Sequence, residues 1–170
     1  ATVYVTITTL DAQLARTLEP RAAAPHRRLC TIRTLVDAGI PVGVSVSPQI
    51  PFINEDMEQV LAAARDAGAN RAFYQVVRLP WEVAPLFREW LQVHHPLRAD
   101  RVMARIRDMR GGKDYDGDFA TRMRGQGVWA DLIRQRFETA CRRLGLNRER
   151  HRLDSSLFRP PGVRSQLSLF

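Results

Sequence analysis

The residues of this chain that are best placed for ligand chemistry follow three apolar segments. Thr6 lies within the first segment, Ser47 and Pro48 follow the second, and Arg78 follows the third. Hydroxyl groups donate and accept hydrogen bonds, and a guanidinium presents a fork of five N–H donors. Each residue alone has a competing explanation of about equal weight, because hydroxyls cap helices and loop charges are solvated. As a set, these side chains predict a shelf that holds a ligand.

Two charged groups accompany this shelf. The first group, Glu19, Arg21 and Arg28, follows the first apolar segment. The alternative to a functional role is again that these are solvated loop charges. Further along, a basic segment interleaves cations with glycines, which lets backbone and charge approach a phosphodiester together. This favours nucleic acid binding, although three nearby aspartates partly cancel the charge and a flexible solvated connector is the alternative. The basic residues are Arg110, Lys113, Arg122 and Arg124.

The chain ends on an apolar peptide, Gln-Leu-Ser-Leu-Phe, after a Pro/Gly-containing segment. It resembles the peptide with which bacterial replication and repair proteins bind the DNA sliding clamp. Leucine and phenylalanine side chains of an extended peptide fill an apolar pocket while glutamine forms hydrogen bonds. The alternative is that the end of the chain folds back onto its own domain. The candidate clamp-binding residues are Gln166, Leu167, Leu169 and Phe170.

Several common catalytic and metal motifs are absent from the sequence. It contains no nucleophile elbow, no phosphate-binding glycine fingerprint and no paired histidine ligands. Cys30 and Cys141 are too far apart to form a metal-ligand pair, and both are expected to be small buried hydrophobes in a reducing compartment. We therefore expect no metal site in this chain and a cytoplasmic location.

The elements that must position these residues alternate between strands and helices. Dense β-branched and aromatic residues predict strands at 2–9, 42–46 and 72–77, with amphipathic helices between them and after the third. This alternation builds a parallel sheet with right-handed crossovers, whose ligands bind beyond the carboxyl ends of the strands. A basic helix at 98–110 and a long helix at 128–144 follow. We assign three regions, residues 1–95, 96–150 and a tail at 151–170.

Composition adds a charge argument. The 170 residues contain 26 Lys plus Arg against 18 Asp plus Glu, a formal charge of +8 that attracts polyanions. Most of this surplus is arginine, which a GC-rich genome would equally explain. No apolar run is long enough to span a bilayer. The chain lacks an initiator methionine and opens within an apparent strand, so we expect it to be a fragment of a longer polypeptide.

Several stretches in order resemble one family, the radical SAM enzymes of the branch related to spore photoproduct lyase and called DNA-repair-photolyase-like. The resemblance runs through VTITT, LEPRAAAPHRRL, AGIPVGVSVSPQIPFIN, VVRLPWEVAPLFREWL and RGGKDYDGDFATRMRGQG. It implies an α/β fold that is the second half of a (β/α)6-type partial TIM barrel, about three βα units, followed by C-terminal helices and an extended tail. The missing N-terminal half of the same polypeptide would complete this barrel.

The resemblance also implies cofactors and roles. In that family a 4Fe–4S cluster on a CxxxCxxC triad binds S-adenosylmethionine and cleaves it reductively to a 5′-deoxyadenosyl radical. This chain lacks the triad, so the cluster ligands would lie upstream and the fragment alone would be inactive. Thr6, Ser47, Pro48 and Arg78 match positions near the bound S-adenosylmethionine. Glu19, Arg21 and Arg28 belong to a signature expected to tie a loop to a helix at the barrel mouth.

We therefore expect the C-terminal part of a radical SAM enzyme that acts on DNA or another nucleic acid in repair. The alternative is a non-catalytic adaptor associated with DNA and the sliding clamp, with a degenerate barrel. The full-length sequence separates the two, because the enzyme requires the cysteine triad. No catalytic residue can be assigned from this chain.

Overall fold

The computed structural model describes residues 2–148 and residue 156. The predicted tail therefore lies almost wholly outside the described residues. The candidate clamp-binding residues Gln166, Leu167, Leu169 and Phe170 also fall there.

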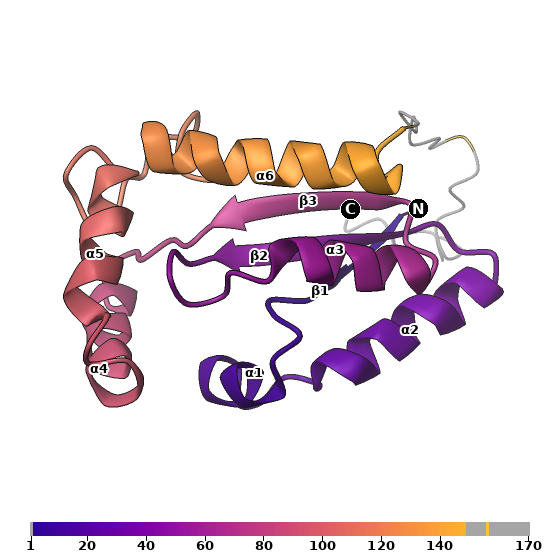
Figure 1. The fold of residues 1–170 in the computed structure, drawn as a ribbon, viewed down its shortest axis with the longest axis horizontal. Coiled ribbons are helices and arrows are strands. Elements are labelled where there is room, and N and C mark those ends of the chain that lie inside the picture. The colour runs from indigo at the N-terminus through magenta and orange to yellow at the C-terminus, as the bar shows by residue number, and fades with distance from the viewer. Residues whose placement is uncertain (1, 149–155, 157–170) are drawn as a thin grey trace, which may run out of the picture.

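Three strands form one parallel sheet: β1 (Val3–Thr6), β2 (Val42–Gln49) and β3 (Arg71–Val76). Their order in the sheet is β1-β2-β3, so strands that are consecutive in the sequence are also neighbours (Figure 1). The sequence-based prediction of three parallel strands at these places is confirmed, although β1 is shorter and β2 longer than expected.

The described residues form six helices: α1 (Ala12–Leu18), α2 (Pro25–Asp37), α3 (Met57–Asp66), α4 (Val83–His94), α5 (Ala99–Asp108) and α6 (Val128–Leu144). Helices α2, α3 and α6 pack along the strands, whereas α1, α4 and α5 lie toward their carboxyl ends (Figure 1). The predicted bounds of α6 agree with the structure. None of the described helices is long and apolar enough to cross a membrane.

Local signals explain where several helices begin and end. The Asp11 carboxylate accepts hydrogen bonds from the backbone N–H groups of Gln13 and Leu14, which caps α1. Pro25 occupies the first turn of α2, where its missing N–H costs nothing. Gly145 ends α6 in the left-handed region, at φ 69°, which glycine adopts without a Cβ penalty.

The main core lies between the sheet and α2, α3 and α6. Val44 and Val46 of β2 are fully buried there, and the predicted apolar stripe of α3 is buried with them. Phe137 of α6 packs against Tyr74 of β3, with ring centroids 4.8 Å apart. A smaller core joins α4 and α5 through Phe87, Leu91 and other apolar residues. Because α6 returns to the first core, the segment after residue 95 completes the layer over the sheet.

The predicted fold class requires correction. The described residues form a small open three-stranded parallel sheet with six helices, and this sheet does not close into a barrel. The expectation of the second half of a (β/α)6-type partial TIM barrel is therefore wrong. Strand–helix alternation dictates parallel pairing and crossover hand, but strand number, tilt and shear decide whether a sheet closes. Those quantities are not encoded in the alternation.

Three expectations about individual residues also change. Cys30 is exposed on α2 rather than buried, while Cys141 is buried as predicted. The apolar pattern of the long helix predicts that Leu132 is buried with Ile133 and Phe137, but Leu132 is 44% exposed because it lies at the edge of the buried face of α6. The position of Asn54 before an acidic turn predicts that it caps α3, but the N-cap of α3 is Asp56.

Candidate ligand-binding groove on the open sheet face

The face of the sheet opposite the helices carries a different set of side chains from the core. Successive residues of a strand point to opposite faces, so the partners of the buried valines point away from the helices. In β1 these are Tyr4 and Thr6, both exposed, and in β3 they include Phe73 and Gln75, both partly exposed. This face combines aromatic rings with polar groups, unlike the aliphatic face beneath the helices.

A groove of about 440 Å³ runs over the carboxyl-end half of this face. Its volume falls within the range of small-molecule sites. The structure brings together all four residues that the sequence assigned to cofactor binding, from three different strands and their following loops. The residues that line the groove are Thr6, Ser45, Ser47, Pro48, Phe73, Gln75, Val76 and Arg78.

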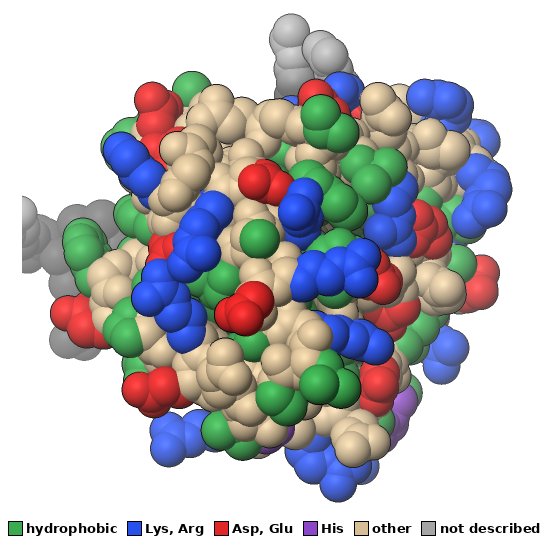
Figure 2. All heavy atoms as spheres, turned by 60° about the vertical axis from the view of Figure 1, so that its left-hand side comes forward, with side chains coloured by type: hydrophobic (Ala, Val, Ile, Leu, Met, Phe, Trp, Pro, Cys, Tyr) green, Lys and Arg blue, Asp and Glu red, His purple; other side chains and the backbone are tan. Residues whose placement is uncertain are grey.

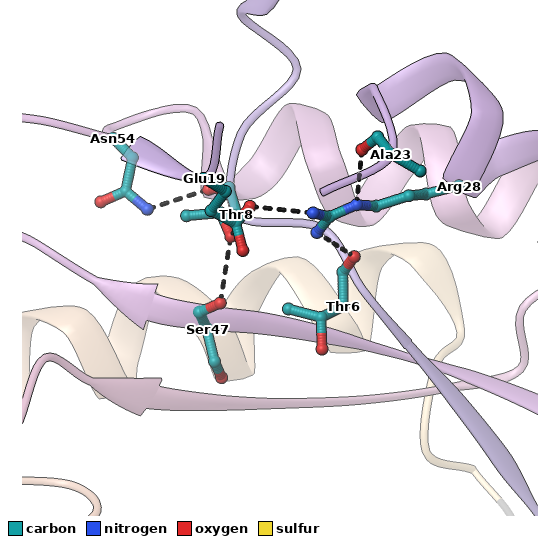
Figure 3. Close-up of polar contacts among 7 residues, drawn as sticks. All are labelled: Thr6, Thr8, Glu19, Ala23, Arg28, Ser47 and Asn54. Carbon is teal, nitrogen blue, oxygen red and sulfur yellow. Dashed lines mark hydrogen bonds and ion pairs between the residues drawn. The ribbon is translucent and has the colours of Figure 1, made fainter. Parts of the chain in front are cut away.

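An irregularity in β2 places Ser47 and Pro48 in the groove. The register between β2 and β3 shifts between Val46 and Gln49, so the intervening residues do not continue the regular ladder. Such bulges redirect side chains. Figure 3 shows the Ser47 and Thr6 hydroxyls pointing in the same direction, away from Glu19 and Arg28. The Ser47 hydroxyl oxygen is buried and has no hydrogen-bond partner among the described residues, so its bonding capacity is unused.

Arg78 supplies the positive charge of the groove. Its guanidinium donates to the Tyr115 hydroxyl at 3.3 Å and to the Met123 sulfur at 3.7 Å, and it lies 5.9 Å from the Tyr115 ring centroid. These partners are neutral, and Arg78 forms no ion pair within the described part of the chain. A carboxylate or phosphate in the groove would be its first anionic partner.

The other end of the open face is aromatic. The Tyr4 ring lies directly over Gly43, where a Cβ would come within 2.3 Å of the ring. The same ring meets Phe73 edge to face, with centroids 5.0 Å apart. Any side chain at position 43 would displace Tyr4, so glycine is what allows this ring to lie flat on the sheet. Phe73 lines the groove, and the Tyr4 ring lies beside it on the same face of the sheet.

A polar network behind the groove fixes the end of β1 (Figure 3). Arg28 of α2 donates to the Thr6 carbonyl at 2.7 Å, to the Ala23 carbonyl at 2.8 Å and to the Glu19 carboxylate at 3.1 Å. Thr8 donates to Glu19 at 2.9 Å and also lies 3.2 Å from the Ser47 carbonyl. The two strand ends that carry Thr6 and Ser47 are therefore connected through one carboxylate.

The three residues expected to tie a loop to a helix, Glu19, Arg21 and Arg28, differ in the structure. Glu19 and Arg28 tie the loop after β1 to α2 as described, and the Arg28 side chain is only 14% exposed. Arg21 is exposed and does not take part in this network. The pair works by orienting the backbone, and neither side chain lines the groove.

Asn54 has a positioning role that the sequence did not indicate. It is 3% exposed, and its amide donates to the carbonyls of Thr8 and Pro48 at 2.9 and 2.8 Å. Its carbonyl accepts from the Ile50 N–H at 2.8 Å. Asn54 therefore satisfies the loop that follows β2 and joins it to the loop after β1. An asparagine before a helix is usually interpreted as its N-cap. Only the tertiary contacts of Asn54 reveal its role between the two loops.

The basic segment lies beside the groove, because its Tyr115 and Met123 contact Arg78. Its four candidate nucleic-acid residues have different environments. Arg110 is only 2% exposed and donates to the carbonyls of Val77 and Thr121 at 2.8 and 3.2 Å. Its guanidinium lies between the end of β3 and the loop that contains Thr121. Arg110 is therefore a structural residue and not a surface contact.

The other three candidates lie nearer the surface. Lys113 and Arg124 are exposed, and Arg122 stacks over the Phe119 ring at 3.7 Å from its centroid. Asp114 forms ion pairs with Arg88 and Arg107. Figure 2, which turns the side bearing α4 and α5 toward the viewer, shows Lys and Arg side chains interspersed with Asp and Glu. The charge on this side is mixed and does not form one continuous basic patch.

The described residues do not fit an iron–sulfur cluster. They contain no group of three His, Cys, Asp or Glu side chains that could hold a metal ion. Both cysteines are free, Cys30 exposed on α2 and Cys141 on the buried face of α6. Burial raises the pKa of the Cys141 thiol to about 11, which disfavours the thiolate that metal binding requires. No chemistry of the groove is derived through a cluster.

Comparisons with known proteins leave the family of this chain open. No protein-family model matches it, and no solved structure matches it. The chain is similar to a curated protein of Acidianus two-tailed virus, described as uncharacterized protein ORF301. The two are 33% identical over 81 residues, which cover 44% of this chain and 27% of the viral protein. The chain therefore spans little more than a quarter of the relative that it matches.

Proposed function

We propose that the groove on the open sheet face binds S-adenosylmethionine, and that the chain is part of a cytoplasmic radical SAM enzyme acting on nucleic acid. The observation that carries this proposal is the convergence of Thr6, Ser47 and Arg78 on one groove with unused bonding capacity. The free cysteines agree with a reducing compartment. When bound beside a reducing cluster, S-adenosylmethionine would supply a carbon-centred radical.

The groove offers a partner for each part of this ligand. Arg78 has only neutral partners, so its guanidinium is available to the carboxylate of the methionine part. The hydroxyls of Thr6 and Ser47 suit the ribose, and the Phe73 ring, which Tyr4 contacts from beside the groove, suits the flat apolar face of adenine. The residues of this chain would bind and orient the ligand.

The nucleic-acid part of the proposal rests on position. The basic segment contacts the groove through Tyr115, and its Lys113 and Arg124 are exposed. A phosphodiester held by these cations would lie next to a ligand in the groove. Arg110 has no part in this contact, because it is buried.

Calorimetric titration of the chain with S-adenosylmethionine, methionine and adenosine tests the binding proposal. Arg78→Gln should weaken S-adenosylmethionine and methionine by about tenfold or more and leave adenosine unchanged, because only the first two carry a carboxylate. Arg21→Gln is the matched control, since Arg21 is an exposed arginine outside the groove. Absence of S-adenosylmethionine binding, or equal weakening of all three ligands, would contradict the proposal.

A further inference from the structure

A second pocket lies at the opposite end of the sheet from the groove, where β3 begins and α6 ends (right-hand side of Figure 1). Its volume is about 210 Å³, and its lining contains three arginines, one asparagine and one glycine. No carboxylate among the described residues lines it. The lining residues are Arg65, Asn70, Arg71, Gly145 and Arg148.

The three arginines come from three separate elements that the fold brings together. Arg65 lies in the last turn of α3, Arg71 is the first residue of β3, and Arg148 follows α6. Asn147 fixes the third position, because its side-chain amide pairs with both the N–H and the carbonyl of Ala72 at 2.9 Å. Its backbone N–H also donates to the Asn70 carbonyl at 3.1 Å. Arg148 is thereby held beside the start of β3.

The Arg148 guanidinium lies against Gly145. A Cβ at position 145 would lie 2.9 Å from the Arg148 Nε and 3.0 Å from its Cζ. Glycine is favoured here for two reasons, since the backbone has φ 69° and the Arg148 guanidinium occupies the space of a Cβ. The close approach keeps Arg148 over the pocket.

None of the three guanidiniums forms an ion pair within the described residues. Arg65 donates to the Ala69 carbonyl and Arg71 to the Thr2 hydroxyl, both at 3.4 Å, the upper limit of a hydrogen bond. Several arginines elsewhere in the fold behave differently. Arg28, Arg107 and Arg136 each hold a carboxylate at 3.1 Å or less.

The nearby helix ends offset only part of the positive charge of the three arginines. The C-termini of α3 and α6 meet at the pocket, and each carries a partial negative charge of about half a unit that favours a nearby cation. Three full positive charges exceed this, and they repel one another across a small space. An anion in the pocket would remove that repulsion and satisfy the free N–H groups.

We propose that this pocket, formed by Arg65, Arg71 and Arg148 around Asn70, binds a phosphate group. Guanidinium forks match phosphate oxygens, and the volume suits a single tetrahedral anion or one phosphate of a chain. The chemistry is shared by free phosphate and by a nucleotide phosphate. The site is separate from the groove and does not depend on the function proposed for it.

The test is calorimetric titration and thermal unfolding of the chain with inorganic phosphate, at ionic strength matched with chloride. A thymidine oligonucleotide with and without a 5′-phosphate is the second ligand. Arg71→Gln and Arg148→Gln each remove one guanidinium. Gly145→Asn keeps all three arginines and tolerates the left-handed backbone, but its Cβ displaces the Arg148 guanidinium. Arg33→Gln, at an exposed arginine of α2 outside the pocket, is the matched control.

We expect phosphate to raise the unfolding temperature of the chain above its value in chloride. The three pocket variants should bind phosphate about tenfold more weakly or worse, and the Arg33 variant should bind like the original chain. The 5′-phosphorylated oligonucleotide could bind more strongly than free phosphate and lose this binding in the same variants. That result would show that the bound phosphate group belongs to a nucleotide. No phosphate binding, or equal binding by all variants, would overturn the proposal. All of these variants retain Arg78, so the result does not depend on ligand binding in the groove.

Discussion

The guanidinium of Arg28 donates a 2.7 Å hydrogen bond to the main-chain carbonyl of Thr6. This bond joins α2 to the last residue of β1, whose side chain lines the groove. Because Glu19 holds the same guanidinium, the charge of Arg28 is neutralised while its geometry is fixed. A surface ion pair contributes little by itself, but this pair is partly buried and orients a strand end.

Replacing Arg28 should therefore destabilise the protein and loosen the groove. Arg28→Gln removes one ion pair and leaves the carbonyls of Thr6 and Ala23 without their donor. We expect a loss of about 2 kcal/mol in the free energy of unfolding, measured by urea denaturation. Arg27→Gln, at the adjacent exposed arginine of the same helix, should change it by less than about 0.5 kcal/mol. Equal losses in the two variants would contradict this role.

Arg110 should stabilise the folded protein through its buried hydrogen bonds rather than contribute charge to the surface. Arg110→Lys keeps the positive charge but cannot donate to the Val77 and Thr121 carbonyls with one planar fork. We expect unfolding at lower urea concentration, with a loss of about 2–4 kcal/mol, because a buried charge would lose its partners. Arg124→Lys, an exposed change in the same segment, should leave the urea midpoint nearly unchanged. A midpoint for Arg110→Lys like that of the unaltered chain would refute the structural assignment.

The Glu58–Arg136 pair should make stability depend on pH in acid. Arg136 donates to both Glu58 carboxylate oxygens at 2.8 and 2.7 Å, which lowers the pKa of Glu58 below its usual 4.5. Since the folded-state pKa is below the unfolded one, the stabilisation is present above about pH 4.5 and is lost as the pH falls through the folded-state pKa. Glu58→Gln should cost about 1 kcal/mol at pH 7 and progressively less in acid.

The control for this pair is Glu89→Gln, at an exposed glutamate of α4. Chemical denaturation at pH 7 and near pH 4 should show a pH-dependent cost for position 58 and none for position 89. A cost at position 58 that is constant across this range would show that the ion pair with Arg136 does not contribute.

The two cysteines should differ sharply in reactivity. Cys141 is 5% exposed and burial raises its pKa to about 11, so only about one thousandth of its thiol is ionised at pH 8. Cys30 is exposed on α2. A thiol reagent such as dithionitrobenzoate should label one thiol rapidly and the second only in denaturant. Cys30→Ser should abolish the rapid phase, whereas Cys141→Ala should leave it; rapid labelling of both thiols in the native chain would be inconsistent with this burial.

Much of the secondary structure could be predicted from the sequence because its signals are local. The valines of β2 and the 3.6-residue spacing of Val60, Leu61 and Ala64 in α3 are properties of neighbouring residues. Parallel pairing of the strands followed from their alternation with helices. Sheet curvature and closure did not, because they depend on contacts between strands that periodicity does not encode.

The candidate groove was predicted only in part. Thr6, Ser47 and Arg78 could be selected because each lies at or after the end of an apolar segment, and ends of parallel strands lie at one edge. Phe73 and Gln75 could have been found from the period of two within β3, since they alternate with buried residues. Asn54 and the burial of Arg110 carried no local signal, because their partners lie in other segments.

The sequence by itself determined where the strands and helices form and which strand ends carry polar side chains, because both follow from the chemistry of adjacent residues. The tertiary structure alone decided that the sheet is open, that Arg110 is buried, and that Arg65, Arg71 and Arg148 share a pocket. Each of these depends on residues far apart in the chain, whose proximity is set by how the helices pack across the sheet.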